Sequence, residues 1–393
     1  MREKLRKGLV VFMMLALLLQ PVTASTALGI EDRLQSYLVG DFESGRLLEE
    51  YNIDQPVSIA SVSKLMTYLV VMDKIQGGSI NLTDRVTITP EIEAVGGSNF
   101  RLLEGEVLTV DELLTGLMVV SGNDAAYALA VHTAGTEAAF AEMMNAKAQE
   151  LGLVNSRFYN SSGLQEGANQ NTMSTREIFE MSRHIIQAYP QVLEYAAVRV
   201  VNMPERNYSA ESTIPLVGEV PGVDGLKTGF TEEAGYCLVS TIDARKSAQG
   251  GEFRLITIVM GTADLSERRD LSKYLIDYSL EKYGIRTIVD ANMPYTQVEI
   301  NSAQNPTVQV FPAQSYRLLT EKAKRYIFKS EINEGLTAPL TAGDSVGTLR
   351  VYADDQEIMT ADLIVQEDVP AANLFARIIR FIETIFSSIG KLL

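Results

Sequence analysis

The sequence predicts an α+β fold in which strands from both ends of the main domain form one antiparallel sheet and helices from its middle form a lobe. Alternating apolar residues predict two early strands, residues 36–42 and 47–52, joined by a tight turn. Three late strands, residues 225–229, 235–241 and 254–260, follow one another through short turns, which favours antiparallel pairing. Helical periodicity fills the middle of the chain.

The N-terminus has the composition of a secretory signal peptide. Residues 9–19 form an apolar run, and residues 21–24 are suited to cleavage after Ala24. The basic residues before the run are Arg2, Lys4, Arg6 and Lys7. The run is too short to span a membrane comfortably. We therefore expect residues 1–24 to be removed and the folded part to work outside the cytoplasm; an uncleaved anchor is the alternative.

A serine and a lysine three residues apart, Ser61 and Lys64, stand at the start of an apolar helical run. Positions i and i+3 lie on one face of a helix, so the two side chains can meet at its N-terminus. A buried lysine that lacks counter-charge loses its proton and can then take one from a serine hydroxyl. The alternative is an N-cap serine followed by a solvated lysine, and this pattern alone does not separate the two.

The middle of the chain is predicted to be helical. Asp111 is the expected N-cap of a helix that ends at Ser121-Gly122-Asn123, a turn that can project a hydroxyl and an amide toward a substrate. Residues 80–110 are polar with a short strand at 85–88. Further helices are expected over residues 125–134, 137–151 and 175–186, with a loop over 157–171.

The strand that begins at Gly225 carries a third triplet, Lys227-Thr228-Gly229. The lysine offers positive charge to a carboxylate, and the threonine hydroxyl can donate to the same group. The glycine lets a substrate backbone approach the strand closely. A helix over residues 265–283 is expected to close this domain.

Residues 285–369 have the pattern of a small, separate all-β domain. Its expected strands are residues 296–300, 307–310, 316–319, 348–352 and 358–365. The segment holds no cluster of reactive side chains, so we expect it to act as a spacer or a docking module.

The last segment, residues 370–393, predicts an amphipathic helix after Pro370. Its apolar side includes Leu374, Ile378 and Ile382, and its polar side carries the basic residues Arg377, Arg380 and Lys391. A terminal helix of this kind is typical of one that lies in the membrane interface. The alternative is a helix packed on the protein's own core.

Composition excludes some classes of function. The 393 residues are 46% hydrophobic and 21% charged, which is ordinary for a globular protein of about two domains. A formal net charge of −16 argues against nucleic acid as a partner. Cys237 is the single cysteine, and with no Cys/His pairing pattern it is expected to be a buried thiol and not a nucleophile.

The three triplets lie about 60 and about 105 residues apart, and their combination is the signature of class A β-lactamases and penicillin-binding proteins. Segments 60–67, 121–126 and 224–229 resemble the motifs of low-molecular-mass penicillin-binding proteins that act as serine-type D-alanyl-D-alanine carboxypeptidases. The resemblance covers most of the chain. It implies a β-lactamase/transpeptidase-like domain over residues 25–284, followed by the all-β domain and the anchoring helix.

The resemblance also implies a role for each residue of the first two motifs. Ser61 is the nucleophile that becomes acylated, and Lys64 is its general base. Ser121 relays a proton to the leaving D-alanine, and Asn123 holds the substrate amide.

The third motif is implied to bind the other end of the substrate. Lys227 and Thr228 receive the terminal carboxylate, and Gly229 belongs to the same strand. The oxyanion hole uses the backbone N–H groups of Ser61 and Phe230. Phe230 is a departure, since many relatives have histidine there. The second motif has glycine where class A β-lactamases have aspartate, and no counterpart of their deacylating glutamate is identified.

The implied function is removal of the terminal D-alanine from peptidoglycan stem peptides through an acyl-enzyme on Ser61, without a metal or cofactor. β-lactam antibiotics such as penicillins would acylate the same serine. The C-terminal helix would hold the enzyme on the anionic outer face of the cytoplasmic membrane. Two alternatives remain: a secreted β-lactamase, and a catalytically silent module that binds penicillin or cell wall. The β domain and tail speak against the first, and the intact Ser61–Lys64 pair speaks against the second.

Overall fold

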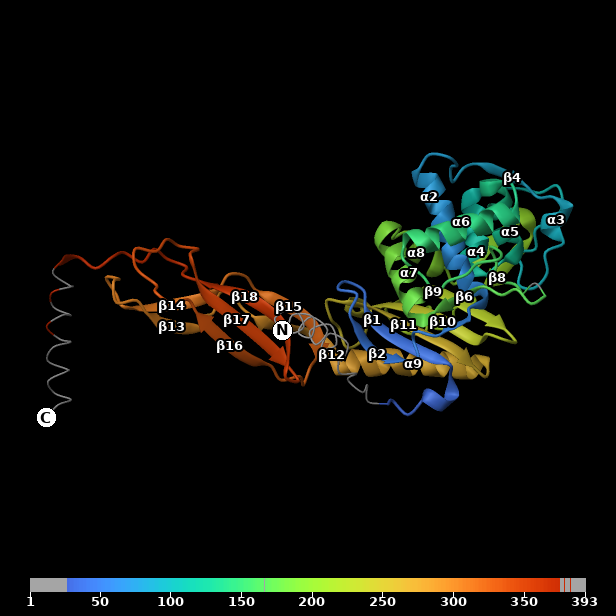
Figure 1. The fold of residues 1–393 in the computed structure, drawn as a ribbon. Coiled ribbons are helices and arrows are strands. Elements are labelled where there is room, and N and C mark those ends of the chain that lie inside the picture. The colour runs from blue at the N-terminus through green and yellow to red at the C-terminus, as the bar shows by residue number, and fades with distance from the viewer. Residues whose placement is uncertain (1–26, 166, 375–377, 379–381, 383–393) are drawn as a thin grey trace, which may run out of the picture. The chain divides into compact units, whose positions relative to one another are not determined.

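The computed structural model describes residues 27–165, 167–374, 378 and 382 (Figure 1). The expected signal peptide, residues 1–24, lies outside the described residues. The chain forms two compact units. The first comprises the described residues up to Ala248 together with Arg254–Asp277, and the second comprises Gln249–Phe253 and the chain from Tyr278 onward.

The first unit is built on a five-stranded sheet of order β2-β1-β11-β10-β9. The strands are β1 (Ser36–Asp41), β2 (Leu47–Tyr51), β9 (Val223–Thr231), β10 (Gly235–Asp243) and β11 (Arg254–Thr262). Every neighbouring pair is antiparallel, and β1 pairs directly with β11. The predicted sheet from both ends of the domain is therefore confirmed, and β9 lies at one of its edges.

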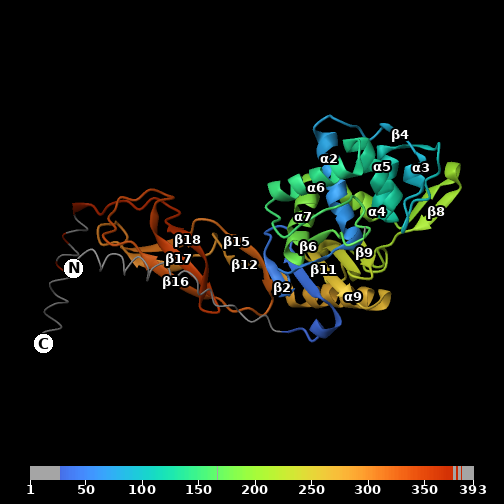
Figure 2. The same ribbon diagram turned by 45° about the vertical axis from the view of Figure 1, so that its right-hand side comes forward.

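A helical lobe covers one face of this sheet, and helix α9 (Leu265–Lys282) covers the other (Figures 1 and 2). The lobe consists of η2 (Ala60–Ser63), α2 (Lys64–Gln76), α3 (Pro90–Glu93), α4 (Val110–Val119), α5 (Asn123–Ala134), α6 (Glu137–Glu150), α7 (Thr175–Ala188) and α8 (Val192–Ala196). Residues 64–72 of α2 are buried without interruption. A helix that is buried on all sides lies at the centre of its domain, so the residues at its N-terminus are held rigidly.

The N-cap of helix α4 is Thr109, two residues before the predicted Asp111. The Thr109 side chain accepts from the Glu112 backbone N–H at 3.2 Å, and Glu112 Oε2 accepts from the Thr109 N–H at 2.7 Å. This reciprocal capping box satisfies donors that a helix start leaves open. Asp111 lies in the first turn, where its charge complements the helix dipole.

Short elements connect the lobe. Three antiparallel strand pairs were not foreseen as pairs: β3 (Pro56–Ser58) with β6 (Thr172–Ser174), β4 (Arg85–Thr87) with β5 (Val107–Thr109), and β7 (Val200–Met203) with β8 (Tyr208–Glu211). Single turns of 3₁₀ helix are η1 (Glu31–Arg33), η3 (Pro204–Arg206) and η4 (Ala244–Lys246).

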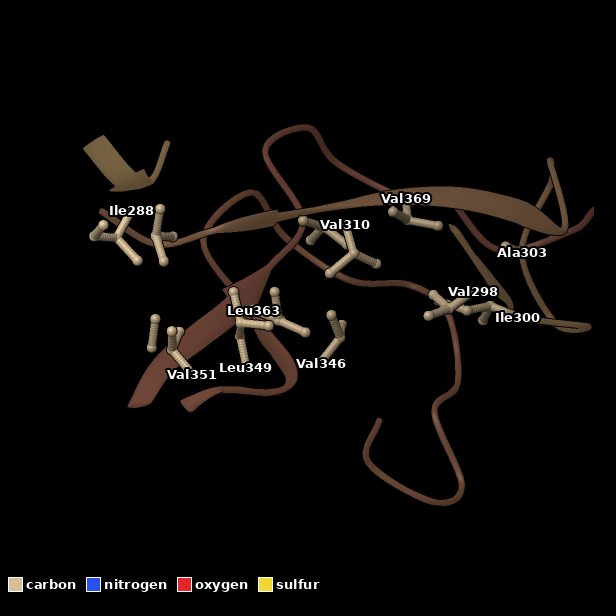
Figure 3. Packing of buried hydrophobic residues seen from close by; sticks show 13 residues of the cluster. Ile288, Val298, Ile300, Ala303, Val310, Val346, Leu349, Val351, Leu363 and Val369 are labelled. Carbon is tan, nitrogen blue, oxygen red and sulfur yellow. The ribbon is translucent and has the colours of Figure 1, made fainter. Parts of the chain in front are cut away.

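The second unit is all-β with a five-stranded sheet of order β13-β14-β18-β17-β16 and a separate β12–β15 pair. Its strands are β12 (Tyr283–Val289), β13 (Thr296–Glu299), β14 (Thr307–Pro312), β15 (Tyr316–Glu321), β16 (Ile327–Ile332), β17 (Ser345–Ala353) and β18 (Gln356–Ile364). Buried aliphatic side chains, including Val310, Leu349 and Leu363, form its core (Figure 3). β12 and β16 were missed; five of the six residues of β16 are exposed, so that strand carries no apolar alternation.

The predicted amphipathic helix is only partly covered by the structure. Leu374, Ile378 and Ile382 are described, they are helical and they are exposed. Residues 370–373 are also described but are not helical, because Ala371 forms an isolated antiparallel bridge with Ala303, so the predicted start of the helix is wrong by a few residues. Residues 375–377, 379–381 and 383–393 lie outside the described residues. No helix within the described part of the chain is both long enough and apolar enough to cross a membrane.

Candidate active site

Ser61 and Lys64 meet at the junction of η2 and α2, as the spacing predicts. Lys64 Nζ lies 2.8 Å from Ser61 Oγ. Lys64 is fully buried, whereas Ser61 is partly exposed to solvent. The solvated-lysine alternative is therefore wrong, and the hydroxyl is the accessible member of the pair.

Lys64 Nζ has two other partners, and both can only accept. It donates to Asn123 Oδ1 at 2.7 Å and to the Ser162 carbonyl at 2.8 Å. A neutral amine has two N–H donors and one lone pair. Because the amide oxygen and the carbonyl occupy both donors, the lone pair of a neutral Lys64 is left for the Ser61 hydroxyl. The three contacts thus fit a lysine that receives the Ser61 proton.

The orientation of Asn123 follows from its second contact. Its Nδ2 donates to the Gly96 carbonyl at 2.8 Å, so its Oδ1 must face Lys64. The next residue, Asp124, is buried and accepts from the backbone N–H groups of Phe100 and Leu102 at 2.7–3.1 Å. This carboxylate fixes the loop before α4 to the start of α5 and thereby holds Asn123 in place.

Burial is the main reason why the pKa of Lys64 lies well below its usual value, and the nearby Lys227 lowers it further. Asp124 and Glu137 act in the opposite direction but do not restore the usual value. A lowered pKa makes the neutral form of a lysine more accessible near neutral pH. Lys64 can therefore act as a base toward Ser61.

The loop over residues 160–164 supplies the third contact of Lys64, a role that its sequence pattern did not predict. Gly163, at φ +78°, follows Ser162, and a Cβ on Gly163 would lie 1.8 Å from the Ala60 carbonyl oxygen. Only glycine permits so close an approach with a left-handed backbone. Thr67 Oγ1 adds a second tie by donating to the Ser161 carbonyl at 2.6 Å.

The strand β9 lies against the turn that carries Ser61. A Cβ on Gly229 would lie 2.9 Å from the Ile59 carbonyl oxygen, so glycine is needed for this contact. Thr228 Oγ1 donates to Thr213 Oγ1 at 2.9 Å, and the Thr213 N–H donates to the Val119 carbonyl at 3.0 Å. These bonds connect the third motif to the end of α4, just before the second motif.

Ser121 is buried between α4 and α5 at φ +61°, a left-handed conformation that is unfavourable for serine. Among the described residues, no hydrogen bond joins Ser121 to Ser61 or Lys64. Direct contacts thus unite Ser61, Lys64 and Asn123. Ser121 is placed near them by the short chain to Asn123.

Lys227 lies in an electropositive part of the site that includes a residue no motif indicated. Lys227 is fully buried, and burial together with nearby Arg268 lowers its pKa to about 7. Arg268, from α9, is itself buried, and its Nε has no hydrogen-bond partner among the described residues. Two buried cations with spare donors favour an incoming carboxylate.

Phe230 follows the third motif and is half-exposed. Its ring stacks on Tyr236 of the neighbouring strand β10, with centroids 4.2 Å apart. The Arg268 guanidinium lies 6.0 Å from the Tyr236 ring on this same part of the sheet. The exposed ring of Phe230 therefore borders the electropositive end of the site. Position 230 is the one at which the resemblance implies histidine in many relatives.

Cys237 is buried as predicted, and burial raises its pKa to about 11. A thiol with so high a pKa is a poor nucleophile at neutral pH. Within the described residues, no group of histidine, cysteine, aspartate and glutamate side chains is arranged to hold a metal ion.

Comparison with known families agrees with this geometry. The family described as D-alanyl-D-alanine carboxypeptidase matches residues 22–264, which is more than half of the chain. This chain belongs to the D-alanyl-D-alanine carboxypeptidase family. A second match, described as the C-terminal domain of penicillin-binding protein 5, covers residues 283–371.

Individual relatives match this family member over most of both chains. The D-alanyl-D-alanine carboxypeptidase DacF of Bacillus subtilis is 29% identical over 336 residues, 84% of each chain. DacA of Haemophilus influenzae is 30% identical over 354 residues, which cover 88% of this chain and 87% of DacA.

A solved structure shares the fold of this family member. Penicillin-binding protein 5 of Haemophilus influenzae superposes with a TM-score of 0.66 at 28% identity, over 86% of this chain and 98% of that protein. The resemblance inferred from the three motifs is thus confirmed, and with it the α+β fold followed by an all-β domain.

Proposed function

We propose that this protein is a serine-type D-Ala-D-Ala carboxypeptidase that removes the terminal D-alanine from peptidoglycan stem peptides and is acylated by β-lactam antibiotics. The observation that carries the proposal is the contact set of Lys64, which leaves its lone pair for the Ser61 hydroxyl. Family membership selects this reaction among those that such a pair can catalyse.

Acylation begins with proton transfer from Ser61 Oγ to Lys64 Nζ. The Ser61 oxygen attacks the carbonyl carbon of the penultimate D-alanine and forms a tetrahedral intermediate. Backbone N–H groups of Ser61 and Phe230 stabilise its oxyanion. The C–N bond then breaks, and the leaving D-alanine amine receives the proton from Lys64, through Ser121 as relay.

Substrate binding and deacylation use the remaining motif residues. Asn123 hydrogen-bonds the substrate amide, and Lys227 and Thr228, on the strand with Gly229, bind the terminal carboxylate. Because Arg268 lies close enough to affect the pKa of Lys227, we assign it to the same anion site. In deacylation, Lys64 takes a proton from water, whose oxygen attacks the ester carbonyl. The bond to Ser61 Oγ then breaks, and Lys64 returns the proton to that oxygen.

The test of this activity compares two substrates on one protein. The purified protein should release D-alanine from diacetyl-Lys-D-Ala-D-Ala and should hold its penicilloyl adduct far longer than a β-lactamase would. Rapid turnover of penicillin without peptide cleavage would favour the β-lactamase alternative. Neither cleavage nor adduct would favour the silent binding module.

Protonation of Lys227 gives a prediction on substrate binding. With a pKa of about 7, Lys227 is charged below pH 7 and neutral above it. A substrate carboxylate needs the charged form, so KM for a free-acid peptide should rise above pH 7, by up to about tenfold per pH unit. The measurement is KM from pH 6 to 9 for the free-acid peptide and its C-terminal amide.

The Lys227→Ala variant serves as the control for that experiment. It should bind the free-acid peptide about 1.5–3 kcal/mol more weakly and lose the alkaline rise in KM. A wild-type KM that stays constant over this pH range, or that is equal for acid and amide, would contradict the assigned role of Lys227.

We further propose that the protein is exported and that residues 370–393 anchor it to the outer face of the cytoplasmic membrane. The basic side chains Arg377, Arg380 and Lys391 suit anionic headgroups and could not enter hydrocarbon without large cost. The exposed Leu374, Ile378 and Ile382 support an apolar face that is open to lipid. The proposal includes domains over residues 25–284 and 285–369, which the two compact units support.

Truncation tests the anchor. The signal-cleaved protein should sediment with anionic vesicles, and a chain that ends at Asn373, which keeps the bonds of residues 370–372 to the β unit, should stay in the supernatant with unchanged peptide cleavage. The double variant Ile382→Asp/Ile385→Asp should also release the protein. A truncated protein that still binds vesicles would point to an uncleaved N-terminal anchor, and a truncated protein that misfolds would show that the tail packs on the core.

A further inference from the structure

The C-terminal β unit contains a slot where its five-stranded sheet opens. β14 pairs with β18 only through Phe311 and Pro312. Beyond that pairing, β14 and residues 365–370 separate and enclose a cavity of about 410 Å³. The other end is closed by the Gln304 N–H, which donates to the Pro370 carbonyl at 2.7 Å. The volume lies within the roughly 300–1,000 Å³ of known ligand sites.

One wall of the slot is a free strand edge. The Val310 carbonyl accepts from the Tyr295 N–H at 2.8 Å, so the even-numbered residues of β14 use their backbone groups toward β13. Neighbouring residues of a strand direct these groups to opposite edges. The N–H and C=O of Gln309 and of Thr307 therefore face the slot, and both residues line it.

The opposite wall is already bonded on its far side. Val365 exchanges hydrogen bonds with residues 343–344, and Val369 exchanges two with Leu340 at 2.8 and 3.0 Å. Val310 and Val369 both belong to the buried core of this unit (Figure 3). Both walls are thus fixed by packing and by bonds directed away from the slot, so the slot is preformed.

The charge of the slot is acidic. The ionisable side chains that line it are Glu367 and Asp368, and Glu299 adjoins it through a 2.8 Å hydrogen bond from Thr307 Oγ1. No lysine or arginine is among the residues that line this cavity in the described part of the chain. A cationic ligand would be complementary to it.

We propose that this slot binds an extended peptide that carries a basic side chain, by adding a short strand to the free edge of β14. Main-chain pairing to Thr307 and Gln309 would supply affinity, and Glu367 would select the cation. The site is separate from the Ser61 chemistry, so it offers the protein a second contact with peptides whether or not the active site is occupied.

The test measures binding of a labelled peptide to protein whose active site is blocked. The full-length protein is first acylated with penicillin. Fluorescein-Gly-Val-Lys-Val-Gly-amide, which has no terminal carboxylate, is then titrated by fluorescence polarisation. Saturable binding is expected. A probe with acetylated lysine should bind at least fivefold more weakly, and a probe N-methylated at alternate amides at least tenfold more weakly, because it cannot pair with a strand edge.

Matched charge reversals distinguish binding in the slot from attraction of the peptide to the protein's overall negative charge. Glu367→Lys should weaken binding at least fivefold, whereas Glu334→Lys, an exposed carboxylate outside the slot in the same unit, should leave it within twofold. Amide exchange at Gln309 should slow when peptide is bound. These measurements do not depend on D-alanine release, so they stand apart from the proposed carboxypeptidase activity.

Four outcomes would overturn the proposal: no saturable binding at millimolar probe, equal binding of the N-methylated probe, equal loss in both charge variants, or loss of binding after acylation, which would place the peptide at Ser61. A fifth would reassign the slot. If the protein forms a dimer in sedimentation experiments that Glu367→Lys dissociates, the occupant is a second copy of the chain and not a free peptide.

Discussion

Replacement of Ser61 by alanine is expected to abolish covalent penicillin labelling and to reduce D-alanine release by on the order of 10⁴-fold or more. Both reactions need the same oxygen nucleophile, and Ser61 Oγ is the partly exposed hydroxyl that lies 2.8 Å from Lys64 Nζ. The measurements are fluorescent-penicillin labelling and D-alanine release from the same preparation.

Ser63→Ala is the matched control, since Ser63 is the nearest rival in sequence. Its Oγ is fully buried and donates to the Ala60 carbonyl at 2.6 Å, so it is not available to a substrate. This variant should keep its penicillin label. If Ser61→Ala still becomes labelled while Ser63→Ala does not, the assignment of the nucleophile is wrong.

Lys64→Met should give the second-largest loss, about 10²- to 10⁴-fold in kcat/KM for the peptide and in the rate of penicillin acylation. Methionine keeps much of the side-chain volume but removes the base. In the wild type, the low pKa of Lys64 means that activity rises as pH increases through that pKa, because only the neutral amine accepts a proton. The acidic limb of the pH profile should therefore belong to Lys64 and disappear in the variant.

A loss of folding would mimic this effect, because Lys64→Met also leaves Asn123 Oδ1 and the Ser162 carbonyl without a donor. Thermal unfolding of the variant, measured beside Lys74→Met in the same helix, distinguishes the two causes. A folded Lys64→Met protein with near-normal acylation would contradict the role of Lys64 as base.

Much of the fold and of the site was predictable because it depends on local signals. Alternation identified the strands of the main sheet, and the i, i+3 spacing of Ser61 and Lys64 identified the contact at 2.8 Å. The cap at Thr109 has the sequence signature of a capping box, threonine followed three residues later by Glu112, and the prediction of Asp111 as N-cap did not use this signal.

Other parts of the site had no local signal. The Ser162 carbonyl is a main-chain group in a loop 98 residues from Lys64, so no side-chain pattern marks its contact with Lys64. Arg268 lies on a helix that follows the sheet, and its effect on Lys227 arises only when that helix covers the sheet. The slot beside β14 depends on where two strands separate, which periodicity does not record.

The most direct test of the account is mass spectrometry of the acyl-enzyme. The protein is incubated separately with penicillin and with diacetyl-Lys-D-Ala-D-Ala, quenched in acid and digested. The account predicts that both reagents add mass to the peptide that contains Ser61, with a long-lived penicilloyl adduct and a transient peptidyl adduct accompanied by free D-alanine. An adduct on another serine, or peptide cleavage without any adduct, would contradict it.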